Sequence, residues 1–110
     1  MAPLTKPTYK ARRVELQKIL EEILGSNQVY FQPKENIKME YPSIVYQRSS
    51  MNTRFADNRP YNSTTRYQVT LIDRNPDTEV PSKLAELPRC TMDRFYIAEN
   101  LNHYTFNLYF

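Results

Sequence analysis

Residues 64–72 read TTRYQVTLI, and this stretch decides the expected fold more firmly than any other part of the chain. Tyr67, Val69 and Leu71 alternate with polar residues, which is the period of two that a strand shows when one face of its sheet is buried. Residues 41–48 (YPSIVYQR) precede it as a second apolar, strand-like run. Together the two stretches predict neighbouring strands joined by a long β-hairpin.

Three further stretches predict the rest of the sheet. Residues 29–31 (VYF) indicate a short strand that ends before Pro33, because proline lacks the N–H that a sheet requires. Residues 92–98 and 104–110 predict two closing strands, and residues 99–103 (ENLNH) predict the turn between them. The sequence therefore predicts an antiparallel sheet of about four to five strands.

A long helix is expected over residues 10–24, where apolar residues recur at helical spacing. Gly25 follows it directly and suits the left-handed position that ends many helices. Leu16 falls outside the apolar stripe. The residues expected to pack on one face of the sheet are Val14, Ile19, Leu20 and Ile23.

A second, short helix is expected to run to about Leu87, after turn residues 75–78 (NPDT) and before Pro88. The predicted class is thus α+β, with a long N-terminal helix and a short second helix packed on the sheet. Residues 1–9 contain two prolines and no periodicity, so we expect an N-terminal arm, followed by a single domain over residues 10–110.

Composition narrows the function classes. Lys and Arg number 15 against 12 Asp and Glu, a mildly basic balance that permits contact with nucleic acid but does not require it. The lone Cys90 gives no disulfide framework. No apolar run approaches the ~20 residues that cross a bilayer, and the N-terminus lacks a secretory apolar segment. We expect no membrane partner.

Catalytic and metal-binding patterns are weak. One glycine cannot build a phosphate-binding loop. Cys90 and His103 could meet as a nucleophile and base across the predicted hairpin, but a packed cysteine and a turn histidine explain them better. Asp73, Asn75 and Asp77 begin like a calcium loop, yet position six is threonine and position twelve is leucine, so we interpret them as turn residues. We expect no enzyme activity, metal or cofactor.

Aromatic residues in the closing strands allow one other interpretation, because bases stack on exposed rings. The alternative is that most of these rings pack beneath the helices, and we favour packing. No specific nucleic-acid binding is expected. The residues concerned are Phe95, Tyr96, Tyr104, Phe106 and Tyr109.

The chain resembles a known family over residues 10–110. YPSIVYQR, followed by RYQVTLIDRNPDTEVPSKLAELPRCTMDRFYIAENLNHYTFNLYF, is similar to the small tail-completion proteins of tailed bacteriophages, and its layout resembles the tail terminator family. The likeness is most specific at residues 66–76, 87–95 and 100–103. These are structural signatures and not catalytic motifs.

The resemblance implies a structural virion protein. Such proteins form a hexameric ring that caps the tail tube, stops its polymerisation and joins the tail to the head connector. It implies a homo-oligomer, the tail tube protein and a connector or stopper protein as partners, and a place in the virion after assembly in the host cytoplasm. The alternatives are another head–tail connector component (a stopper or an adaptor) or a small nucleic-acid-binding regulator.

The expected interaction segment is the polar stretch 49–63, which separates the two central strands. Connections of this length are often functional, and an isolated hairpin is marginally stable in water, so a partner is expected to supply packing. Arginines in this segment suit an interface because the planar guanidinium binds a carboxylate through two hydrogen bonds at once. The expected interface residues are Arg48, Arg54, Phe55, Asp57, Arg59 and Tyr61.

Overall fold

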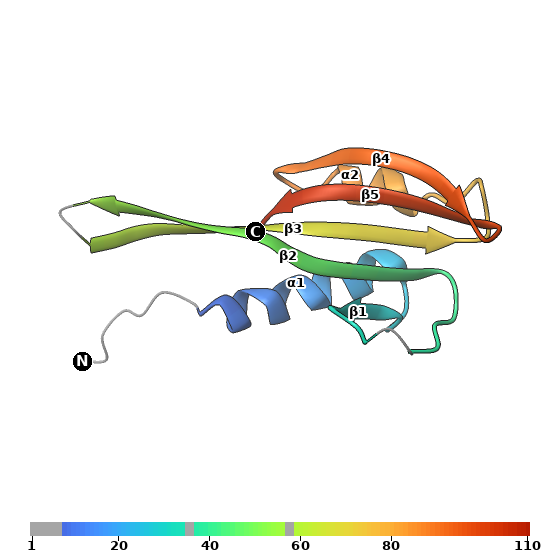
Figure 1. The fold of residues 1–110 in the computed structure, drawn as a ribbon, viewed down its shortest axis with the longest axis horizontal. Coiled ribbons are helices and arrows are strands. Elements are labelled where there is room, and N and C mark those ends of the chain that lie inside the picture. Colours follow the sequence, from blue (N-terminus) through green and yellow to red (C-terminus); the bar gives the residue numbers. More distant parts are fainter. Residues whose placement is uncertain (1–7, 35–36, 57–58) are drawn as a thin grey trace.

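The computed structural model contains a five-stranded sheet with two helices on one of its faces (Figure 1). It describes residues 8–34, 37–56 and 59–110, and it describes residues 51–56 and 59–64 by their backbone alone. In chain order the elements are α1 (Tyr9–Leu24), β1 (Val29–Phe31), β2 (Ser43–Ala56), β3 (Arg59–Asp73), α2 (Val80–Ala85), β4 (Cys90–Ala98) and β5 (Leu101–Tyr109).

The strands lie in the order β1-β2-β3-β5-β4. The α+β class, the five strands and the two helices are confirmed. Four strands form the predicted antiparallel sheet, whereas β1 joins β2 in parallel, with Val29 opposite Ile44. A parallel pair needs a connection that returns the chain to the same end of the sheet, and residues 32–42 between β1 and β2 supply it.

Helix α1 begins and ends on local signals in the sequence. The Thr8 hydroxyl accepts a hydrogen bond from the Ala11 N–H at 3.0 Å, which satisfies one of the unpaired amides of the first turn. Gly25 adopts a φ of 79°, and its N–H donates to the Glu21 carbonyl at 2.8 Å. The left-handed conformation favours glycine, so the predicted end of the helix is confirmed.

The side of α1 that faces the sheet differs in part from the prediction. Leu20 is fully buried as expected, but Leu16 is also fully buried, while Val14 is 38% exposed. Leu16 and Leu20 are four residues apart and point the same way from successive turns. The prediction that omitted Leu16 in favour of Val14 is wrong, because Leu16 and Leu20 form the centre of the contact between α1 and the sheet.

The core lies between the helices and one face of the sheet. Gln17 links α1 to the sheet by accepting from the Tyr46 hydroxyl and donating to the Val29 carbonyl at 3.0 Å. Burial raises the pKa of Tyr46. The other buried apolar residues of the core are Leu16, Leu20, Ile44, Tyr67, Val69, Leu71, Leu84, Phe106 and Leu108.

The opposite face of the sheet carries no helix within the described residues, and its side chains are mainly polar. Gln47 donates to Gln68 across the strands at 3.1 Å. Tyr96 stacks on His103 with ring centroids 4.6 Å apart, and the Arg94 guanidinium lies 4.8 Å from the Tyr96 ring. On this uncovered face, the polar and aromatic side chains therefore interact with one another.

The β4–β5 turn is shorter than predicted. Glu99 and Asn100 form a two-residue turn with φ values of 53° and 63°, the conformation that matches the twist of paired strands. Residues 101–103, expected in the turn, instead begin β5. Asn102 donates from Nδ2 to the Asp73 carbonyl at 3.1 Å, which fixes this end of β5 to β3.

Leu16→Ala and Leu20→Ala should each lower the free energy of unfolding by about 2–5 kcal/mol, because each removes a fully buried side chain. Val14→Ala is the matched control, and its exposed position should limit the change to about 0.5 kcal/mol. Urea unfolding followed by circular dichroism measures all three. Equal losses at Leu16 and Val14 would contradict the packing described.

Candidate functional site

The β2–β3 hairpin extends beyond the rest of the sheet as a two-stranded ribbon (Figure 1). Strand β5 pairs with β3 only from Arg66 to Asp73, whereas β2 pairs with β3 as far as Ala56 opposite Arg59. The Phe110 N–H donates to the Thr65 carbonyl at 3.0 Å, and beyond that bond the described backbone of each of the two strands pairs only with the other. A two-stranded ribbon is marginally stable in water, so this extension is a candidate for contact with a partner.

A β-bulge marks the point where the ribbon leaves the sheet. The register shifts between Arg48 and Ser50, so that Ser49 is the extra residue. The Ser49 hydroxyl donates to the Arg66 carbonyl at 3.0 Å and accepts from the Arg66 Nε at 3.0 Å. Bulges bend a strand and increase its twist, so this feature sets the direction in which the ribbon projects.

Arg48 anchors the base of the ribbon. Its Nη2 donates to the Tyr9 carbonyl at 3.3 Å, and its guanidinium lies 5.1 Å from the Phe31 ring. The Arg13 guanidinium lies 4.7 Å from the same ring, so Phe31 interacts with two cations. The structure thus places Arg48, a predicted interface residue, in contacts with α1 and β1 of its own chain.

The other predicted interface residues cannot be placed in this way. Their side chains lie outside the described residues, so their interface role stays a prediction. They are Arg54, Phe55, Asp57, Arg59 and Tyr61.

The outer strand β4 forms a second candidate surface, because apolar side chains that are buried in the three central strands give way to exposed ones in β4. On the helix-bearing face one row of opposed residues runs Tyr46, Val69, Phe106 and Met92. The first three are at most 1% exposed, whereas Met92 is 50% exposed. Helix α1 contacts β1 and β2, and the short helix α2 contacts β4 but leaves Met92, Phe95 and Ile97 exposed.

Two more rows follow the same trend. Leu71 and Tyr104 lead to Phe95, which is 49% exposed, and Asp73 and Asn102 lead to Ile97, which is 66% exposed. Sequence reasoning identified β4 as a strand but missed this exposed apolar edge. The apolar residues of β4 do share one face, but only the order of the strands reveals that this face is uncovered.

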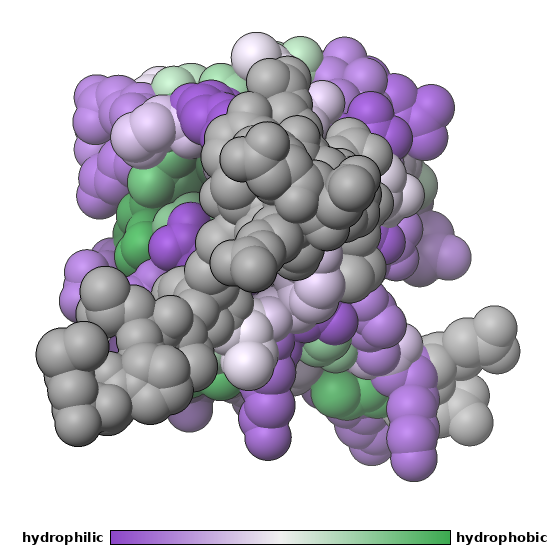
Figure 2. Space-filling model, turned by 90° about the vertical axis from the view of Figure 1, so that its left-hand side faces the viewer, coloured by the Kyte–Doolittle hydropathy of each residue, from purple (hydrophilic) through white to green (hydrophobic). Residues whose placement is uncertain are grey.

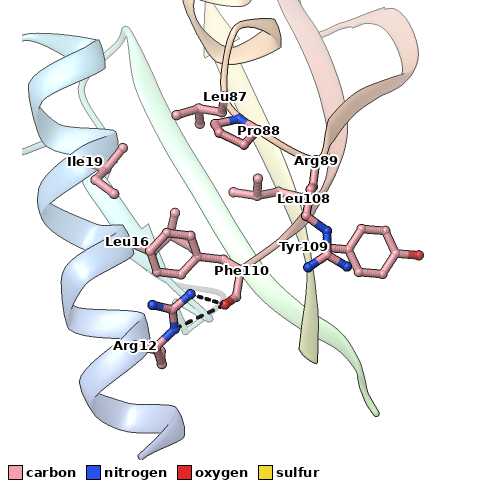
Figure 3. Close-up of a pocket in the computed structure, with 9 residues that line it drawn as sticks. All are labelled: Arg12, Leu16, Ile19, Leu87, Pro88, Arg89, Leu108, Tyr109 and Phe110. Atoms are coloured by element: carbon pink, nitrogen blue, oxygen red, sulfur yellow. Dashed lines mark hydrogen bonds between the residues drawn. The ribbon is translucent and has the colours of Figure 1, made fainter. Parts of the chain in front are cut away.

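A cavity of about 370 Å³ opens between α1, the segment after α2 and the end of β5 (Figure 3). Arg12 donates to the Phe110 carbonyl from Nε at 3.2 Å and from Nη2 at 2.6 Å, and it pairs with Glu15 at 3.3 Å. Its guanidinium also lies 4.2 Å from the Phe110 ring. The Arg12 guanidinium is thus engaged within the chain. The other lining residues are Leu16, Ile19, Leu87, Pro88, Arg89, Leu108 and Tyr109.

Apolar and polar surface alternate on the side of the molecule seen in Figure 2, where patches of hydrophobic side chains are bordered by hydrophilic ones. The cavity has a mainly apolar lining. It offers packing to an apolar group but no arrangement of nucleophile, base and oxyanion donors that would indicate a reaction.

The structure separates Cys90 from His103. Cys90 lies opposite Leu108 and His103 opposite Tyr96, so the two positions are five residues apart along β5, about 17 Å at the usual strand rise. They also lie on opposite faces, because side chains alternate along a strand. A Cys–His dyad is therefore excluded within this chain. Burial raises the pKa of the Cys90 thiol, which makes it a poorer nucleophile at neutral pH.

Asp73, Asn75 and Asp77 form turns, as interpreted from the sequence. Asp73 Oδ1 accepts from the Asn75 N–H at 3.0 Å, and Asn75 Oδ1 accepts from the Asp77 N–H at 3.0 Å. Within the described residues no three His, Cys, Asp or Glu side chains are grouped in a way that could hold a metal ion.

Of the aromatic residues considered for base stacking, the structure places Phe106 in the core, as expected, whereas Phe95 is half exposed.

Alkylation of Cys90 should show its raised pKa. Because burial disfavours the thiolate, we expect the rate with iodoacetamide to rise at higher pH in the folded protein than in the urea-unfolded protein, over a range from about pH 7 to pH 10. Cys90 is the only cysteine, so intact-mass measurement reports it alone. A folded profile that rises at the same or a lower pH would contradict the description of this site.

Comparisons with known proteins add no assignment. No protein-family model matches the chain, and no curated protein sequence is similar to it. Among the described residues, no helix has the length and apolar character needed to span a membrane.

Proposed function

We propose that this protein is a structural assembly protein that forms a ring on the phage tail tube, ends its polymerisation and joins the tail to the head connector. The observation that carries the proposal is the β2–β3 ribbon, which extends past β5 with no further strand beside it along the described backbone. Exposed amides and carbonyls along such a ribbon gain hydrogen bonds when a partner docks. The ribbon is therefore the expected contact with a neighbouring copy or with the tube.

The fold supports this proposal in a second way. The resemblance to tail terminators implies an antiparallel sheet covered by helices, and this chain has four antiparallel strands with two helices on one face. A ring requires two different surfaces on each copy, because head-to-tail contacts join unlike patches. In the proposed ring the ribbon is one of these surfaces, and a patch on the next copy is the other.

The base of the ribbon supports a rigid projection. The bulge at Ser49 is held by two hydrogen bonds to Arg66, and Arg48 bonds the Tyr9 carbonyl on α1. A ribbon anchored in this way loses less conformational freedom on docking than a loose loop would. Arg54 and Arg59, farther along the ribbon, would then pair with carboxylates of the partner.

Arg54→Glu combined with Arg59→Glu should leave the subunit folded but weaken ring formation or tube capping. The reason is that two cations that would pair with a partner become anions. Native mass measurement of the purified protein, alone and with tube protein, reports the assembly. In infected cells, electron microscopy should show long, unterminated tails.

Lys34→Glu combined with Lys83→Glu is the matched control. It makes the same change in net charge at two exposed positions away from the ribbon, and assembly should persist. Normal assembly of the Arg54/Arg59 variant would overturn the proposed role of the ribbon. Salt-dependent affinity for DNA, without a defined oligomer, would instead favour a nucleic-acid-binding regulator.

A further inference from the structure

The outer edge of β4 is unusual for the surface of a protein subunit. The strand is nine residues long, and on its outer side it has no strand partner among the described residues. Three of its side chains are large, apolar and exposed: Met92, Phe95 and Ile97. Exposed strand edges invite pairing with another chain, and proteins usually protect them with charges, prolines, bulges or a covering element.

Only the first part of this edge carries features that protect against pairing. The register shifts between Met92 and Arg94, which leaves Asp93 as a bulge and puts two charged residues side by side. Residues 95–98 (FYIA) contain no charge, proline or glycine and remain regularly paired with β5. The unprotected stretch thus runs from Phe95 to the end of the strand, and Arg94 before it is regularly paired with β5 as well.

We propose that this edge pairs with the same edge of a second copy, antiparallel about Tyr96, so that two sheets join into one. In that register Phe95 lies opposite Ile97 of the other copy, and Ile97 lies opposite its Phe95. A two-fold axis perpendicular to the sheet keeps the helix-bearing faces on one side, so these four apolar side chains gather in a single patch. Cross-strand aromatic and β-branched pairs of this kind stabilise a sheet.

The charges of the paired stretch are compatible with a second copy as the occupant. Arg94 is the one charged residue of the paired stretch, and it lies opposite the uncharged Ala98 of the other copy. The two Arg94 side chains are then four residues apart along the strands, about 14 Å, which exceeds the screening length of about 8 Å at physiological salt. The two copies therefore bring no like charges together within residues 94–98, and the like charges of Asp93 and Glu99 meet only beyond the two ends of that stretch.

The contact is separate from the ribbon. The ribbon extends β2 and β3 along their own direction, whereas β4 is the lateral edge of the sheet on the side of β5. The β4 pairing therefore goes beyond the ring proposed above and does not depend on it. Both contacts can form on one subunit without competing for the same residues.

Cysteine cross-linking tests the register directly. In a Cys90→Ser background, Tyr96→Cys should form a disulfide with itself on mild oxidation, because directly opposed residues have Cα atoms about 4.5–5.5 Å apart, within disulfide reach. Thr91→Cys is the control, since it lies on the same strand and is exposed but falls outside the paired stretch. We expect at least a tenfold excess of disulfide-linked dimer at position 96 in non-reducing gels of the purified full chain.

Two further variants keep the test decisive if Tyr96→Cys fails to fold. A Phe95→Cys protein mixed with an Ile97→Cys protein, one of them carrying a mass tag, should give the mixed disulfide in preference to either self-linked product. Ile97→Lys should halve the mass seen by sedimentation at equal concentration, whereas Val14→Lys, the same change at an exposed apolar site on α1, should not.

The outcomes separate the two proposals. Equal cross-linking at positions 91 and 96, or unchanged mass for Ile97→Lys, overturns the β4 pairing. A monomeric chain whose β4 edge is protected only by added tube protein also overturns it. Cross-linking at position 96 that persists in the Arg54/Arg59 double variant supports it whether or not rings form.

Discussion

Packing of α1 against one face of the sheet is the interaction on which the rest of the molecule depends. Leu16 and Leu20 are fully buried, and Gln17 between them bonds both Tyr46 of β2 and the Val29 carbonyl of β1. A sheet is stable only when at least one face is covered by another element. Here the long helix lies over β1 and β2, so burial is most complete in β2 and β3 and declines toward β4. The exposed edge of β4 follows from that off-centre position.

The other face is stable for a different reason. Its residues are mostly polar, and they pair with one another, as Gln47 does with Gln68 and as Tyr96 does with His103. Arg94 and His103 both lie against the Tyr96 ring, one as a cation and one as a stacked ring, so that ring already has partners. A nucleic-acid base would have to displace one of them. This weakens the base-stacking interpretation of the aromatic strands, whatever the net charge of the chain.

Much of this fold could be predicted from local patterns. The alternation of Tyr67, Val69 and Leu71 identified β3, although the strand begins at Arg59 and not at residue 64. Gly25 marked the end of α1 because a left-handed residue is needed there. Local patterns failed where burial or pairing depends on which element lies alongside. Leu16 could be recognised as a core residue only once the direction of α1 over β2 was known. The parallel pairing of β1 likewise depends on which strand lies beside it.

The candidate surfaces show the same limit. The segment between the two central strands was predicted from its polarity and length, yet Arg48, at its base, turns inward onto Phe31 and the Tyr9 carbonyl. Long arginine side chains can bury their stems and reach acceptors on their own subunit, so residue type alone does not distinguish an anchor from an interface residue. The apolar edge of β4 escaped prediction for the opposite reason. Met92, Phe95 and Ile97 have the spacing of core residues, and only the strand order shows that nothing described covers them.

The anchored ribbon and the β4 edge both belong to one small domain. Arg48 and the Ser49 bulge fix the ribbon at its base, so the position of the ribbon is set by the same core that holds α1. The β4 edge is tied to that core through β5, which pairs with β3 from Arg66 to Asp73. If both proposed contacts form, they are built on one sheet and keep a constant angle to each other. A constant angle between contacts allows copies to close into a symmetric particle.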